Sequence, residues 1–174
     1  MSANDPVFLL KIADALVEEV SQSTDVVLQA AQELQNRDGF IEGVRGAFSA
    51  GKLTGNLKNN LSLAIKLCES SAQLDPSIKL ENGLASGAIK AKALFHFGLI
   101  SIGQKSFKEA VKYFEDSINY EADQATYFNI ALCLLEMKGL FRDRTQDAVG
   151  ALQKCMAHLK SIVDFLMPHW LCKL

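Results

Sequence analysis

The sequence predicts an all-α protein, and three observations support this. Ala, Leu, Lys, Glu, Gln and Ser, mostly good helix formers, dominate the composition, and the 174 residues include only three prolines. Apolar residues recur at spacings of three and four, which is typical of amphipathic helices, and alternating β-branched runs are scarce. Because 49% of the residues are hydrophobic, a core can form, and we expect a single all-α domain over residues 1–174.

Charge and targeting signals narrow the classes of partner. The formal net charge is -2 and no Lys/Arg cluster stands out, so we expect no nucleic-acid partner. The N-terminus carries acidic residues where a signal peptide has basic ones, and no apolar run is long enough to span a membrane. We therefore expect a cytoplasmic protein whose four cysteines are free thiols.

Residues 5–40 are expected to form N-terminal helices. Asp5 is a suitable N-cap and Pro6 suits the first helical turn. The buried stripe of this helix consists of Phe8, Leu9, Ile12, Leu16 and Val20. The polar stretch "SQSTDVV" predicts a break, after which Ser23 or Thr24 caps a second helix that ends near Gly39.

Residues 45–160 contain an internal repeat. The stretches "LAIKLCESSAQLDPS", "EAVKYFEDSINYEAD" and "DAVGALQKCMAHLK" align so that their small and large apolar positions coincide. The aligned sets are Ala64, Ala110 and Ala148, then Cys68, Phe114 and Leu152, then Ser71, Ser117 and Cys155. Polar breaks at 103–106, 121–124 and 139–144 separate the later helical segments.

These positions resemble the tetratricopeptide repeat, a unit of about 34 residues that folds as two antiparallel helices, A and B. Helix A is matched by "LFHFG" and "YFNIA", which place Gly98 and Ala131 33 residues apart. Gly98 precedes Ala110 by the twelve residues that the family requires, so we expect helices A and B to cross closely there. The resemblance implies an array of degenerate helical hairpins, best matched at 90–134. The alternative is an unrelated helical bundle.

Departures from the family pattern predict local differences. The step from Ala131 to Ala148 is 17 residues, so "GLFRDR" should form a longer loop between the two helices. About a dozen extra residues follow Pro76, and Ala122 replaces the closing proline of the second unit.

The segment "GAFSAGKLTGN" also spells most of a phosphate-binding loop, with Gly46, Gly51 and Lys52 at the right spacing. Leu53 stands where a hydroxyl should bind magnesium, and the charged residues before Gly46 do not suit a buried strand. Counting twelve residues back from Ala64 instead assigns 45–58 to the first helix A, with a turn at 59–60. We expect residues 46–56 to be helical or irregular, while a nucleotide-binding regulatory domain stays an alternative.

No arrangement predicts catalysis or a metal site. Cys155 and His158 mirror His169 and Cys172, but eleven helical residues separate the two histidines by roughly 16 Å. Neither a nucleophile elbow nor a base beside a nucleophile is apparent. We expect a non-enzymatic protein without cofactor or metal.

The family resemblance implies a protein-interaction module, such as an adaptor, a scaffold or a co-chaperone. Ligands of this family lie along the concave face, and the matching positions here predict an apolar groove for a peptide or a helix. Those positions are Phe95, Leu99, Ile102, Phe128, Leu132 and Leu135. The same side chains would be covered if the N-terminal helices fill the groove. A secretion-type chaperone of similar repeat architecture is an alternative function.

The C-terminal tail, residues 161–174, is unusually apolar for the end of a repeat array. Trp170, Leu171 and Leu174 predict that it folds back, forms a homo-oligomer or lies on a membrane surface.

Overall fold

A computed structural model describes residues 5–32, 51–137 and 145–166. Within these ranges the chain forms helices and no strands beyond one isolated bridge between Lys79 and Ala85, which confirms the all-α prediction. The helices are α1 (Pro6–Gln32), α3 (Gly51–Leu74), α4 (Ser86–Gly103), α5 (Phe107–Ile118), α6 (Gln124–Glu136) and α7 (Thr145–Leu166). None of these six helices combines the length and apolar character that crossing a membrane requires.

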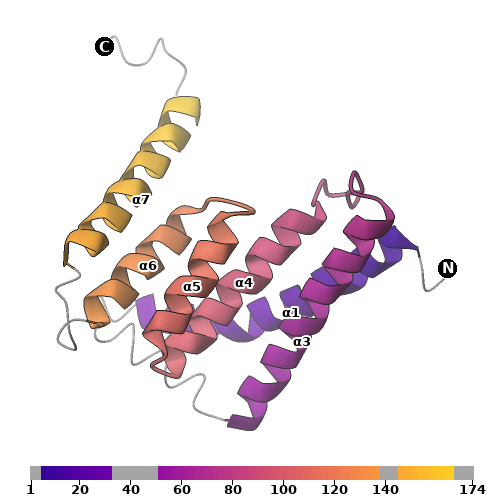
Figure 1. Cartoon of the computed structure of the whole chain (residues 1–174), viewed down its shortest axis with the longest axis horizontal. Coiled ribbons are helices and arrows are strands. Elements are labelled where there is room, and N and C mark those ends of the chain that lie inside the picture. The colour runs from indigo at the N-terminus through magenta and orange to yellow at the C-terminus, as the bar shows by residue number, and fades with distance from the viewer. Residues whose placement is uncertain (1–4, 33–50, 138–144, 167–174) are drawn as a thin grey trace.

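Each helix packs against the next one along the chain, which produces a helical array (Figure 1). Two hydrogen bonds fix the direction of α1 and α3. The Ser71 hydroxyl donates to the carbonyl of Pro6 at 2.8 Å, and the Asn60 amide donates to the Glu19 carboxylate at 3.3 Å. The end of α3 therefore lies beside the start of α1, and the two helices are antiparallel.

The same alternation continues into the next pair. Lys58 of α3 donates to Gln104, just after α4, whereas Glu69 pairs with Lys90 near the start of α4. Helices α3 and α4 are therefore antiparallel, and Figure 1 shows the later helices also running alternately up and down.

The crossing of α4 and α5 depends on one glycine. A Cβ atom added to Gly98 would lie 2.6 Å from Cζ and 2.7 Å from Cδ1 of the Phe114 ring, and closer still to Cε1. Phe114 is itself fully buried. The small residue predicted at this crossing is therefore required by the packing of the two helices.

The predicted break near Ser23 and Thr24 is wrong, because α1 is one continuous helix. The Ser23 hydroxyl donates to the carbonyl of Glu19, and the Thr24 hydroxyl donates to the carbonyl of Ser21, each at 2.9 Å. Hydroxyl groups that bond back to the preceding turn are tolerated inside a helix, so they need not act as caps. The predicted Asp5 cap is confirmed, since its carboxylate accepts from the Val7 amide at 3.0 Å.

The predicted turn at residues 59–60 is also wrong, because α3 continues through it. An uninterrupted buried stripe explains this continuity: Leu57, Leu61, Ala64 and Cys68 are all buried at helical spacing. The helix that pairs with α3 is consequently α1, and not a helix formed by residues 45–58. Residues 45–50 of that predicted helix, Gly39 and the predicted loop at "GLFRDR" lie outside the described residues.

Candidate functional site

The six predicted groove residues differ widely in exposure. Leu99 and Ile102 are fully buried, Leu132 is nearly so, and Leu135 is partly buried against the core. Phe95 is partly buried and packs against the Phe114 ring, with 5.6 Å between ring centroids. Phe128 has 45% of its surface exposed. The six side chains therefore do not line one open surface.

Helix α4 packs against α3 and α5 on its two sides and also contacts α1. The Thr24 hydroxyl lies 3.2 Å from Nδ1 of His96, and both residues are almost completely buried. Leu99 is one turn beyond His96 on the same face of α4. The N-terminal helix therefore lies against α4 beside this part of the predicted groove.

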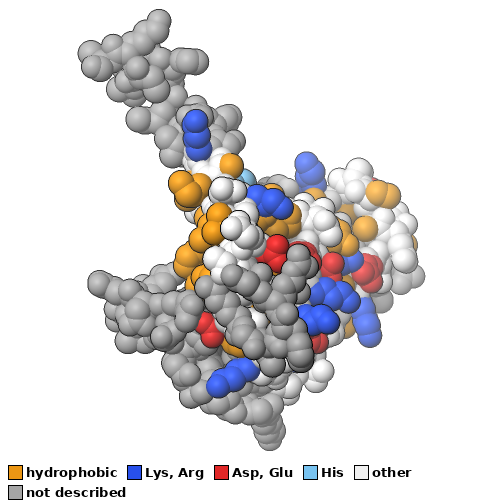
Figure 2. Space-filling view, turned by 60° about the vertical axis from the view of Figure 1, so that its left-hand side comes forward, with side chains coloured by type: hydrophobic (Ala, Val, Ile, Leu, Met, Phe, Trp, Pro, Cys, Tyr) orange, Lys and Arg blue, Asp and Glu red, His pale blue; other side chains and the backbone are white. Residues whose placement is uncertain are grey.

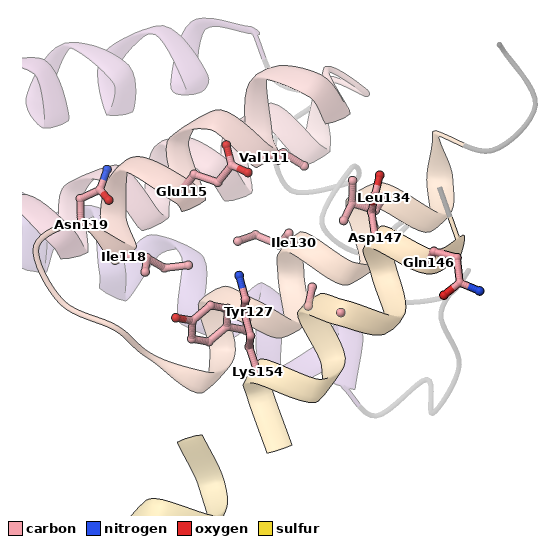
Figure 3. Close-up of a pocket in the computed structure, with 12 residues that line it drawn as sticks. Val111, Glu115, Ile118, Asn119, Tyr127, Ile130, Leu134, Gln146, Asp147 and Lys154 are labelled. Atoms are coloured by element: carbon pink, nitrogen blue, oxygen red, sulfur yellow. The ribbon is translucent and has the colours of Figure 1, made fainter. Parts of the chain in front are cut away.

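A different groove lies between α5, α6 and α7, on the face shown in Figure 3. It has a volume of about 570 Å³, and its apolar lining includes Val111, Ile118, Ile130 and Leu134. Ile118 and Ile130 point toward each other in Figure 3. The charged residues of the groove are Glu115, Asp147 and Lys154, so its lining has mixed charge.

A second, smaller hollow of about 370 Å³ lies beside Phe95. Thr126 of α6 and His158 of α7 also line it, together with the turn that precedes α6. Asp123 in that turn is the N-cap of α6 and accepts from the Thr126 amide at 3.3 Å, so this carboxylate has a structural role.

Helix α7 exposes a stripe of apolar side chains, which we call the open face of α7. It consists of Val149 (42% exposed), Met156 (69%) and Leu159 (43%), with the partly buried Leu152 between them. These residues follow one another at spacings of three and four, so they share one side of the helix. Hydrophobic side chains are visible on this part of the surface, on the left of Figure 2.

The internal repeat gives the open face a counterpart on α5. Ala110 of α5 aligns with Ala148 of α7, so Val111 corresponds to Val149 and Ile118 corresponds to Met156. On α5, these two residues are partly buried against the core and border the groove beside the Tyr127, Ile130 and Leu134 side chains of α6. Helix α7 therefore exposes the positions that, on α5, border the groove beside the next helix of the array.

Sequence reasoning missed this surface although the alignment contained the signal. The repeat was recognised from the small residues at the helix crossings, Ala110 and Ala148. The exposed position is one residue later, at Val149, and its counterpart on α5 is Val111. Val111 and Val149 have the same chemical character, so only their packing partners distinguish a buried side chain from an exposed one.

Two of the cysteines, Cys68 and Cys133, are poorly suited to nucleophilic chemistry. Burial raises the pKa of the Cys68 and Cys133 thiols to about 12, so both stay protonated at neutral pH. Among the residues that the structure describes, no group of three His, Cys, Asp or Glu side chains could hold a metal ion. Cys155 and His158 lie on α7, whereas His169 and Cys172 lie outside the described residues.

The glycine-lysine segment is only partly described. Helix α3 begins at Gly51, and residues 46–50 and the Lys52 side chain lie outside the described part of the chain. Residues 51–56 are helical, as expected.

Comparison of the chain with family models, with curated proteins and with solved structures finds no match.

Proposed function

We propose that this protein is a non-enzymatic protein-interaction module, a tetratricopeptide-like array that binds an amphipathic helix on the open face of α7. One observation carries the proposal. The apolar positions of α5 that border the groove beside α6 are repeated on α7, where no described helix covers them. A surface adaptor or scaffold function follows from a face of this kind, because burying it requires a partner.

The geometry of α6 on α5 defines the helix that would fit. Helix α6 borders the α5 side chains with Tyr127, Ile130 and Leu134, a spacing of three and then four residues. A partner helix with large apolar residues at this spacing would pack between Val149 and Met156 in the same way. Complete burial of each such side chain contributes about 1.5–3 kcal/mol, which supports a specific but reversible complex once the cost of association is met.

The groove predicted from the sequence contributes less to this proposal. Of its residues, Phe128 on α6 is the one with a largely exposed side chain. We retain Phe128 as a candidate contact for a partner that extends beyond α7.

Affinity capture with matched variants tests the proposal. Met156→Glu places a charge on the open face, whereas Ala157→Glu places the same charge on the neighbouring exposed position, about 100° further round the helix. We expect a partner that the wild type and Ala157→Glu both retain and that Met156→Glu loses. If quantitative mass spectrometry finds the same bound proteins for all three chains, the open face is not a binding site.

A further inference from the structure

We infer that the helix which covers the open face of α7 is α7 of a second copy, packed antiparallel across a two-fold axis. This inference rests on the proposed function and names its partner. Three features of the molecule support this partner: the spacing of the stripe, the antiparallel order of the array and the position of the charges on α7.

The stripe is complementary to itself when one copy is reversed. Val149, Leu152, Met156 and Leu159 are separated by three, four and three residues, which read the same in both directions. In an antiparallel pair, Val149 lies opposite Leu159 of the second copy, and Leu152 lies opposite Met156. Every facing pair then joins two apolar side chains, as in helix pairs that interdigitate.

An antiparallel pair also continues the construction of the array. Where hydrogen bonds fix the direction of neighbouring helices, as for α1 with α3 and α3 with α4, the neighbours are antiparallel. A second α7 would occupy the place on the first α7 that α6 occupies on α5. Because the two-fold contact uses the same face on both copies, it closes on itself and covers the open face of α7 in each copy.

The charges on α7 permit this approach. When histidine is neutral, the charged side chains within residues 145–160 are those of Asp147, Lys154 and Lys160. Asp147 and Lys154 line the groove with α5, so they lie on the side of α7 away from the stripe. Lys160 alone flanks the stripe, near one end, so pairing buries no like charges at the centre of the contact.

Sedimentation equilibrium of the full chain tests self-association. We expect a dimer, with twice the 19.1 kDa mass of the chain. Met156→Glu should raise the dissociation constant at least about a hundredfold, because each copy brings an unpaired carboxylate into the contact. The control Ala157→Glu should change it by less than about threefold. Circular dichroism of each variant establishes that the helices are retained.

Cross-linking tests the orientation. In a background in which Cys155 and Cys172 are changed to Ser, one chain carries Val149→Cys and another carries Leu159→Cys. Ten helical residues separate these positions by roughly 15 Å, so neither chain alone should form a disulfide in an antiparallel pair. The mixture should cross-link on mild oxidation.

The outcomes separate this inference from the proposed function. A chain that stays monomeric at all concentrations, or that cross-links as a single variant, overturns the α7 pair. If that monomer still captures another protein in a manner that depends on Met156, the proposed open face stands and only the second copy is rejected. A monomer with no Met156-dependent binding contradicts both.

Discussion

Substitution of Gly98 by alanine tests the packing of the array most directly. The added methyl group would come within 2.7 Å of three atoms of the Phe114 ring, or closer. The ring is fully buried and packs against Phe95, so it has little freedom to move away. Helices α4 and α5 must therefore separate, or the ring must leave its preferred rotamer.

The expected size of the effect combines two opposing contributions. Overpacking in a core costs about 1–3 kcal/mol, and three close contacts place Gly98→Ala in the upper part of that range. Alanine recovers about 1 kcal/mol of helix propensity relative to glycine. We therefore expect the free energy of unfolding to fall by about 1–2 kcal/mol and the melting temperature to fall by about 2–8 °C.

Urea denaturation followed by circular dichroism measures this change, and two further variants make it specific. Gly150 lies inside α7, and a Cβ atom there meets nothing within 4 Å, so Gly150→Ala should stabilise the protein by about 0.5–1 kcal/mol. Phe114→Leu should cost less in the Gly98→Ala background than alone, because the smaller side chain relieves the contact. A Gly98→Ala protein as stable as the wild type, or strictly additive effects of the two changes, would refute the reasoning.

Two other predictions concern buried polar and titratable groups. Ser117→Ala removes the hydrogen bond from the Ser117 hydroxyl to the carbonyl of Ala91, which joins α5 to α4 at 2.9 Å, and should lower the free energy of unfolding by about 1 kcal/mol in urea denaturation. For the buried thiols, folding raises the pKa of Cys68 and Cys133 from 9.0 to about 12, so unfolded chains release these protons first as the pH rises. Stability should therefore be retained below pH 9 and decrease between pH 9 and pH 12. The decrease should be shallower in a Cys68→Ala, Cys133→Ala variant, and equal pH slopes for the two proteins would contradict this assignment.

The helices at the centre of the chain were predictable because local and tertiary preferences agree there. Gly98 and Ala110 stand at the offset of two closely crossing helices, and Gly98 meets the side chain one turn beyond Ala110, at Phe114. The polar breaks before Phe107 and Gln124 coincide with real helix starts. In these segments the apolar period, the turn residues and the packing all indicate the same structure.

The errors occur where polar residues permit two local structures. Thr24 can cap a new helix or bond back within an existing one, and its neighbour His96 on α4 lies 72 residues away in the sequence. Asn60 is compatible with a turn, yet its amide bonds to Glu19 from within a helix. In both cases the deciding contact is with a distant helix, which local patterns do not contain. The open face of α7 was missed for a related reason, since exposure depends on which helix comes next.

The contact between α1 and α4 also affects how the chain folds. An array in which each helix touches only its neighbours can form step by step from local contacts, with little loop-closure entropy lost at each step. The Thr24–His96 contact instead closes a segment of 72 residues, and the entropy lost in this closure grows with the logarithm of its length. Helix α1 is thereby tied to α3 and α4 together, so that detaching it exposes the apolar faces of two helices at once. The N-terminal half of the chain is for this reason expected to open as one cooperative unit in native-state hydrogen exchange, and separate opening of α1 alone would argue against that coupling.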